Sequence, residues 1–115
     1  MKQQEHLLQC ACVRWFAYQW PEYRGILFAV PNGGARSKAT AGKLKAEGVV
    51  AGVADLLLLV PSRGFHGLCV EMKTEMGRQS PEQKEWQAKA EAAGYKYVVC
   101  HSLDEFMETI NNYLT

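Results

Sequence analysis

Hydrophobic and polar positions predict a pair of strands in the middle of the chain. Residues 52–60 and 65–73 are both rich in leucine, valine and other apolar residues, and the tetrapeptide between them is Pro-Ser-Arg-Gly. Such a tetrapeptide is typical of a turn between antiparallel strands, so we expect a hairpin that reverses near Arg63. Residues 56–60 are apolar at every position, which indicates a strand covered on both faces of the sheet.

A long helix is expected ahead of this hairpin, over residues 3–19. Its apolar residues recur at helical spacing and form one stripe, and Pro21 ends the helix. The stripe residues are Leu7, Leu8, Ala11, Trp15 and Tyr18. A short apolar strand is expected at residues 25–30, and Ser37 is placed to cap a second helix that runs to about residue 47.

Two serines predict the starts of two further helices after the hairpin. Ser80 is followed by proline and, at the third helical position, by Gln83, which is the pattern of a capping box. Ser102 and Glu105 have the same spacing and open a final helix, with an apolar strand at residues 95–100 between the two helices. The inward residues of that final helix are expected to be Phe106, Ile110 and Leu114.

The expected order is helix, strand, helix, hairpin, helix, strand, helix. A strand reached through a crossover helix runs parallel to the strand before it. The order therefore predicts an α/β fold with a mixed β-sheet flanked by helices. A chain of 115 residues suits a single domain over residues 1–115.

Charge and cysteine content bear on the partners of this domain and on its cellular compartment. The formal net charge is +1, so any attraction to nucleic acid has to come from a local basic patch rather than from the whole molecule. The four cysteines lie in apolar segments without a Cys-x-x-Cys pair, and we expect reduced, buried thiols in a cytoplasmic protein. No apolar run approaches the roughly 20 residues of a membrane span.

The candidate chemistry lies on the hairpin. If the pairing is symmetric about Arg63, Asp55 lies opposite Glu71. Because side chains alternate between the faces of a sheet, Glu71 and Lys73 then point to the same face as Asp55. One interpretation is a cross-strand salt bridge, which contributes little to stability. The other is a metal site, in which the two carboxylates and the backbone carbonyl of Met72 offer hard oxygen ligands to Mg²⁺ or Mn²⁺.

Burial favours the metal site, because carboxylates in a strand covered on both faces are costly without a cation. Glu5 lies in the first turn of the first helix, where the helix dipole favours an acid. The turn that contains Asn32 and the basic stretch after it are candidates for contact with phosphodiester groups, or a plain turn and a solvated face. The candidates in that region are Asn32, Arg36, Lys38 and Lys43.

These residues carry a resemblance to a known family. Asp55 followed by Glu71-Met72-Lys73 resembles the signature of the PD-(D/E)xK nucleases, and the flanking segments resemble their VRR-NUC branch. The flanking matches are Glu5, Pro31-Asn32-Gly33-Gly34, Gly52 and the segment Gly77-Arg78-Gln79-Ser80-Pro81-Glu82-Gln83. Ala54 stands where the family usually has proline, which puts the local backbone geometry in question more than the chemistry.

The resemblance implies a restriction-endonuclease-like core and a DNA endonuclease that depends on Mg²⁺ or Mn²⁺. It implies that Asp55 and Glu71 hold the metal with the Met72 carbonyl, that Lys73 positions the attacking water or stabilises the transition state, and that Glu5 acts directly or through water. It also implies that Gln83 faces the active site, a role that competes with the helix cap for the same amide. Family members of the stand-alone phage and bacterial type resemble Holliday junction resolvases, so branched or junction DNA and a homodimer are expected.

Two other hypotheses remain. One is a non-catalytic nucleic-acid-binding or assembly module, in which the charged residues form a structural ion pair. The other is a metal-dependent hydrolase of a small phosphate ester, which leaves the basic helix without a role.

Overall fold

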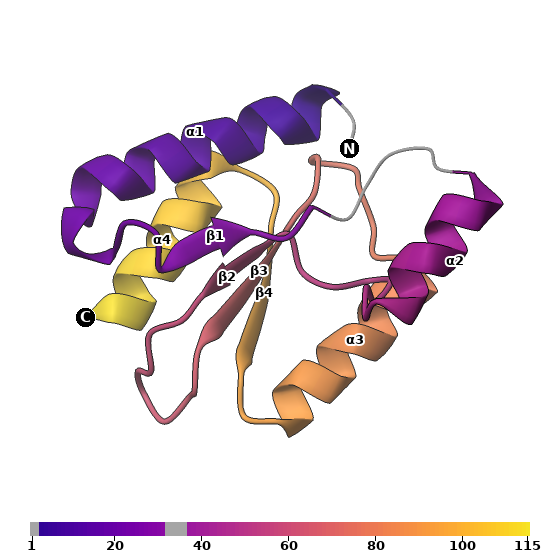
Figure 1. Ribbon diagram of the computed structural model, residues 1–115. Coiled ribbons are helices and arrows are strands. Elements are labelled where there is room, and N and C mark those ends of the chain that lie inside the picture. Colours follow the sequence, from indigo (N-terminus) through magenta and orange to yellow (C-terminus); the bar gives the residue numbers. More distant parts are fainter. Residues whose placement is uncertain (1–2, 32–36) are drawn as a thin grey trace.

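The expected elements are all present in the computed structural model, which describes residues 3–31 and 37–115 (Figure 1). The elements are α1 (Gln3–Gln19), a short 3-10 turn (Pro21–Tyr23), β1 (Leu27–Ala29), α2 (Lys38–Ala46), β2 (Leu56–Leu58), β3 (Leu68–Met72), α3 (Pro81–Ala92), β4 (Lys96–Cys100) and α4 (Leu103–Leu114). Within those two ranges, no helix has both the length and the apolar character that crossing a membrane requires.

The described strands form one mixed sheet in the order β1-β2-β3-β4. β2 pairs antiparallel with β1 and with β3, whereas β4 runs parallel to β3 because α3 carries the chain back across the sheet. The predicted mixed sheet flanked by helices is confirmed.

The hairpin has the predicted register. Leu56 pairs with Val70, so Asp55, one residue before, and Glu71, one residue after, lie across from each other. The turn closes through a bridge between Ser62 and Phe65, and Arg63 has a positive φ of 52°. The paired strands are shorter than predicted, although the Leu59 amide donates to the Ile26 carbonyl at 3.1 Å and so continues the register of β1 and β2 beyond Leu58.

Helices cover both faces of the sheet (Figure 1). α1 and α4 share one face, where Phe16 and Phe106 pack against Leu56 and Val70. α3 lies on the other face, where Ala90 packs with Cys69 of β3 and Tyr97 of β4. α2 lies beyond the N-terminal end of α3, and all its residues except Leu44 are exposed. The face under α3 is the one that carries Glu71, because Glu71 follows Cys69 by two positions.

Three expectations about burial are wrong in part. Leu59 is 54% exposed and Leu57 only half-buried, because α3 covers β3 and β4 and leaves part of β2 open. In α1, Leu7 and Tyr18 are exposed, whereas the buried positions are Cys12 and Phe16, four residues apart. Among the cysteines, which all lie in the described ranges as free thiols, Cys10 is exposed because it is on the outer side of α1.

The two predicted capping boxes differ in the structure. In the first, the Ser80 hydroxyl accepts from the Gln83 amide at 3.2 Å and the Gln83 side-chain oxygen accepts from the Ser80 amide at 2.8 Å, as predicted. In the second, Ser102 caps α4, but the Glu105 carboxylate accepts from the amide of His101 at 2.7 Å. The same oxygen, Oε1 of Glu105, also lies 3.3 Å from Nδ1 of the His101 ring, so both contacts come from one histidine.

Gly52 links the start of β2 to the start of α3. It has a positive φ of 85°, and a side chain there would overlap the backbone carbonyl of Glu82 in the first turn of α3. A glycine is therefore required twice, for the backbone conformation and for the close approach of the two segments. This contact helps to hold the segment that leads into Asp55 against α3.

The contact makes a testable prediction. Gly52→Ala is expected to destabilise the fold more than Gly48→Ala, which also has a positive φ but has open space around it. The control substitution introduces only backbone strain of about 1–2 kcal/mol, and Gly52→Ala adds overpacking that typically costs a further 1–3 kcal/mol. Urea denaturation measures both free energies of unfolding, and equal losses would mean that the approach of the two segments is not tight.

Candidate active site

Three charged residues of the hairpin meet at one end of the sheet. Asp55 directly precedes β2, Glu71 is in β3, and Lys73 directly follows β3. The register places Asp55 and Glu71 opposite each other on the α3 face, as predicted. Glu71 is 1% exposed, and the Lys73 side chain is 14% exposed, so the group is sheltered from bulk water.

The backbone of β3 holds Asp55. Its Oδ2 accepts a hydrogen bond of 2.6 Å from the amide of Met72, which fixes the carboxylate beside Glu71. Burial raises the pKa of Asp55 above its ordinary value, and the charges of Glu71 and Glu5 raise it further. The Met72 hydrogen bond and the charge of Lys73 act in the opposite direction but do not cancel the increase. Asp55 thus ionises less readily in the folded protein than in a free chain.

The two oxygens of Glu71 have different surroundings. Oε1 accepts from the Tyr97 hydroxyl at 2.5 Å and from the Gln79 side-chain amide at 3.0 Å. Oε2 is buried and has no hydrogen-bond partner among the residues that the structure describes. Its nearest cation is the Lys73 ammonium, at 3.5 Å, which is an ion-pair distance longer than a good hydrogen bond.

This arrangement fits a divalent cation. A buried carboxylate oxygen without a donor is costly, and a bound cation would relieve that cost. Within residues 3–31 and 37–115, no three residues of the types His, Cys, Asp and Glu lie close enough to hold a metal together. The candidate donors are therefore the two carboxylates and the Met72 carbonyl. This set is typical of Mg²⁺, which usually binds one or two carboxylates and keeps several waters.

Two predicted site residues lie further from the carboxylate pair. Glu5 is half-buried in the first turn of α1, and its charge reaches Asp55, but it does not complete a three-acid cluster. Gln83 uses its side-chain oxygen in the cap of α3. The glutamine that contacts Glu71 is Gln79, which lies four residues before Gln83 in the loop ahead of α3.

Sequence reasoning did not select Gln79 and Tyr97. Gln79 lies in the polar loop before the Ser80 cap and gives no periodic signal. The sequence predicts Tyr97 only as a residue of an apolar strand. In the structure Tyr97 of β4 pairs with Cys69 of β3, which places its ring on the face of Glu71. Burial and the hydrogen bond to Glu71 raise the pKa of Tyr97, so its hydroxyl stays protonated and donates. Because side chains alternate between the two faces of a strand, the position of Tyr97 in the strand was the signal that could have placed it on the face of Glu71.

The predicted nucleic-acid contacts divide into two groups. Asn32 and Arg36 lie outside the described residues. Lys38 and Lys43 lie in α2, the helix that precedes β2, and both side chains are exposed. The structure therefore presents these lysines to solvent.

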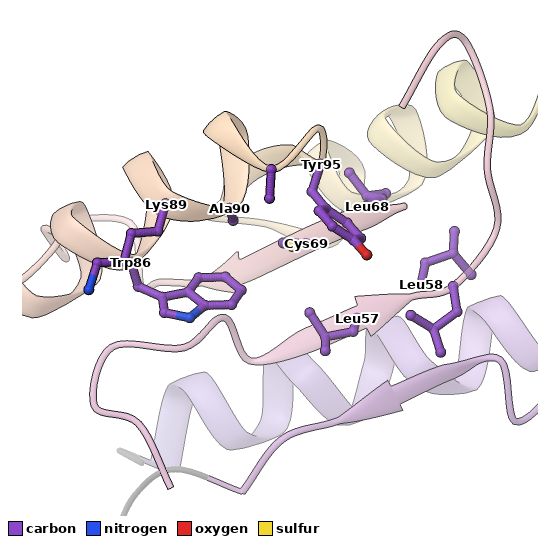
Figure 2. A pocket seen from close by; sticks show the side chains of 10 residues that line it. Leu57, Leu58, Leu68, Cys69, Trp86, Lys89, Ala90 and Tyr95 are labelled. Atoms are coloured by element: carbon purple, nitrogen blue, oxygen red, sulfur yellow. The ribbon is translucent and has the colours of Figure 1, made fainter. Parts of the chain in front are cut away.

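An apolar hollow of about 300 Å³ lies between the sheet and α3 (Figure 2). Leu57 and Cys69, which follow Asp55 and precede Glu71 by two residues, form its floor, and Trp86 and Ala90 of α3 form its wall. Its lining is mostly apolar, with Lys89 and Tyr95 as the main polar side chains, and it contains no carboxylate.

Asp55 gives a prediction about stability. Its pKa is raised on folding, so ionised Asp55 opposes folding, and this cost appears as the pH rises above about 4. Asp55→Asn retains an oxygen for the Met72 amide and removes the charge. In EDTA at pH 7 the variant should melt a few degrees higher than the wild type, with a smaller difference near pH 4.

The control is Asp104→Asn, at an exposed position in the first turn of α4, which should not raise the melting temperature. An Asp55→Asn variant that is less stable than the wild type at neutral pH would contradict the proposed charge strain.

Comparison with known proteins places the chain in a family. The profile of the VRR-NUC domain matches residues 1–104. A solved structure described as "VRR_NUC domain protein" is similar with a TM-score of 0.85 and 25% sequence identity, over 99% of this chain and 90% of that chain. No curated protein matches the chain. The family model covers most of the sequence, and the chain belongs to the VRR-NUC domain family of nucleases.

Proposed function

We propose that this nuclease hydrolyses DNA phosphodiester bonds with Mg²⁺ or Mn²⁺ held by Asp55 and Glu71, in the manner of the PD-(D/E)xK superfamily. The observation that supports the proposal is the buried Oε2 of Glu71, which faces Lys73 and lies across the hairpin from Asp55. The Met72 carbonyl would be a further ligand. The proposal explains why the fold keeps a carboxylate in a position where it is costly.

Charge balance supports the same assignment. The two carboxylates and Lys73 together leave one net negative charge in a sheltered site, so one ammonium group does not neutralise the pair. A divalent cation would reverse the sign of the site and make it attractive to a phosphodiester, which carries one negative charge. A purely structural ion pair would need only one acid.

The bound cation would polarise the scissile phosphate and lower the pKa of the attacking water. Lys73 supplies a fixed positive charge beside Oε2, where it would orient the water or stabilise the charge that develops on the phosphate. Glu5 would act through a water molecule, since its charge reaches Asp55 from α1. Gln83 would serve the site through the cap of α3, with its amide nitrogen left for a phosphate.

We also propose that the partner is branched or junction DNA and that two copies of the chain pair. Exposed lysines of α2, Lys38 and Lys43, would contact the phosphodiester backbone together with Asn32 and Arg36. Such contacts carry no base information, so selectivity would follow the shape of the DNA. Exposed apolar side chains on the open part of the sheet, Phe28 and Leu59, favour pairing of two copies, which would make paired cuts.

Cleavage of branched and linear DNA tests the assignment. With Mg²⁺ or Mn²⁺ the wild type should cut branched DNA faster, and EDTA should stop the reaction. Glu71→Gln and Lys73→Met should each lower the rate by about 10² or more, because electrostatic stabilisation of the transition state is lost. Asp55→Asn should do the same while raising stability.

A matched control is available on α3. Lys89 and Glu85 form an ion pair with the same separation of 3.5 Å, but both side chains are exposed. Lys89→Met and Glu85→Gln should leave the cleavage rate unchanged. Unaltered cleavage by the Asp55, Glu71 and Lys73 variants would reject the proposed site, and DNA binding without cleavage would favour the non-catalytic module.

A further inference from the structure

A chain of polar side chains runs from the surface of α3 to the buried carboxylate of Glu71. The Gln87 amide donates to Glu91 at 3.3 Å, and its oxygen accepts from Gln79 at 2.8 Å. The same Gln79 nitrogen donates to Glu71 Oε1 at 3.0 Å, and Tyr97 donates to that oxygen from β4. Two donors from different elements therefore meet on one oxygen of Glu71.

The orientation of the Gln79 amide follows from its neighbours. Both of its hydrogens point at oxygen acceptors, one on Glu71 and one on Gln87. If the amide were reversed, its own oxygen would face both acceptors, which is repulsive. The carboxylate of Glu91 orients Gln87 in the same way, because a carboxylate accepts and does not donate. The direction of donation along the whole chain is thus set by the two carboxylates at its ends.

The consequence is an asymmetric carboxylate. Oε1 is engaged by Tyr97 and Gln79, whereas Oε2 faces Lys73. Both donors to Oε1 are neutral, so they fix the position of the carboxylate without cancelling its negative charge. A lysine or arginine in their place would fix it equally well but would weaken its attraction for a cation. The fold therefore holds Glu71 rigidly and keeps its charge.

We infer that Tyr97 and Gln79 are positioning residues: their hydrogen bonds occupy Oε1 of Glu71, so that only Oε2 is available to the cation. This inference rests on the proposed function, because it assigns a role to the surroundings of the same site. A carboxylate held in this way binds a cation through one oxygen, and the protein rather than the cation decides which one. Partners that orient a ligating group are typically worth 10–100-fold in metal affinity.

The inference also predicts a preference among cations. Mg²⁺ demands a near-ideal octahedral arrangement of its ligands, so it should be the cation most sensitive to a carboxylate that rotates. If Tyr97 is replaced, Gln79 alone holds Oε1, and both oxygens can approach the cation. A larger or more tolerant ion accepts that change at lower cost. Loss of the donors should therefore weaken Mg²⁺ binding more than Mn²⁺ binding.

Calorimetric titration of the whole chain with MgCl₂ or MnCl₂, without DNA, tests this role independently of catalysis. Tyr97→Phe and Gln79→Leu should each raise the Kd for Mg²⁺ by about tenfold, and that for Mn²⁺ by less. Gln87→Ala, which removes one support of Gln79, should have a smaller effect. Tyr95→Phe is the matched control, since Tyr95 lies two residues before Tyr97 and packs its ring against His66; its affinities should match those of the wild type.

Melting temperatures of the same variants separate positioning from stability. If Tyr97→Phe fails to fold, Gln79→Leu and Gln87→Ala carry the test, because these side chains lie at the edge of the core. Variants that bind both cations as tightly as the wild type, with or without a lower melting temperature, would overturn the inference and leave the proposed function intact. If the wild type and Glu71→Gln respond alike to both cations, the proposed metal site itself fails.

Discussion

Burial of one carboxylate is the constraint on which the arrangement of this protein depends. Glu71 lies near the end of β3, an inner strand, on the face that α3 covers, where an ionised group is costly unless donors and positive charge compensate it. Tyr97 and Gln79 supply the donors and Lys73 the positive charge. Asp55, however, adds a second carboxylate across the hairpin, at a position where its burial and the charge of Glu71 oppose its ionisation. The hairpin thus concentrates negative charge at a position where a fold selected for stability alone would avoid it.

Contacts with the surrounding elements hold the two acids in place despite the repulsion between their negative charges. The Met72 amide fixes Asp55, so the backbone of one acid's strand holds the other acid. Gly52 lets the segment before Asp55 lie against the first turn of α3, and the Ser80 cap begins that helix where Gln79 can reach Glu71. The site is therefore built from the segment before β2, the strand β3 and the start of α3, which hydrogen bonds and close packing hold together. Rigid placement of ligands is what a cation with strict geometry requires.

The acids, the apolar hollow and the exposed lysines of α2 lie in different parts of the molecule. The acids occupy one end of the sheet, the apolar hollow under α3 begins two residues further along the same strands, and the exposed lysines lie on α2. With a net charge of only +1, the molecule has little long-range attraction for nucleic acid. Recognition of DNA by such a domain would depend on where these surfaces lie relative to the acids.

The amino-acid sequence by itself determined the order of the elements, the mixed sheet and the pairing of Asp55 with Glu71, because these follow from local signals: periodicity, caps and the turn at Arg63. It also predicted Lys73 on the same face, since alternation along a strand is a local property. The Ser80 cap with Gln83 is local in the same way and was also predicted. Only the tertiary structure decided that Gln79 and Tyr97 meet on Glu71 and that Leu59 stays exposed. Those outcomes depend on how α3 packs across β3 and β4, and such contacts between segments distant in the chain leave no periodic trace in a single sequence.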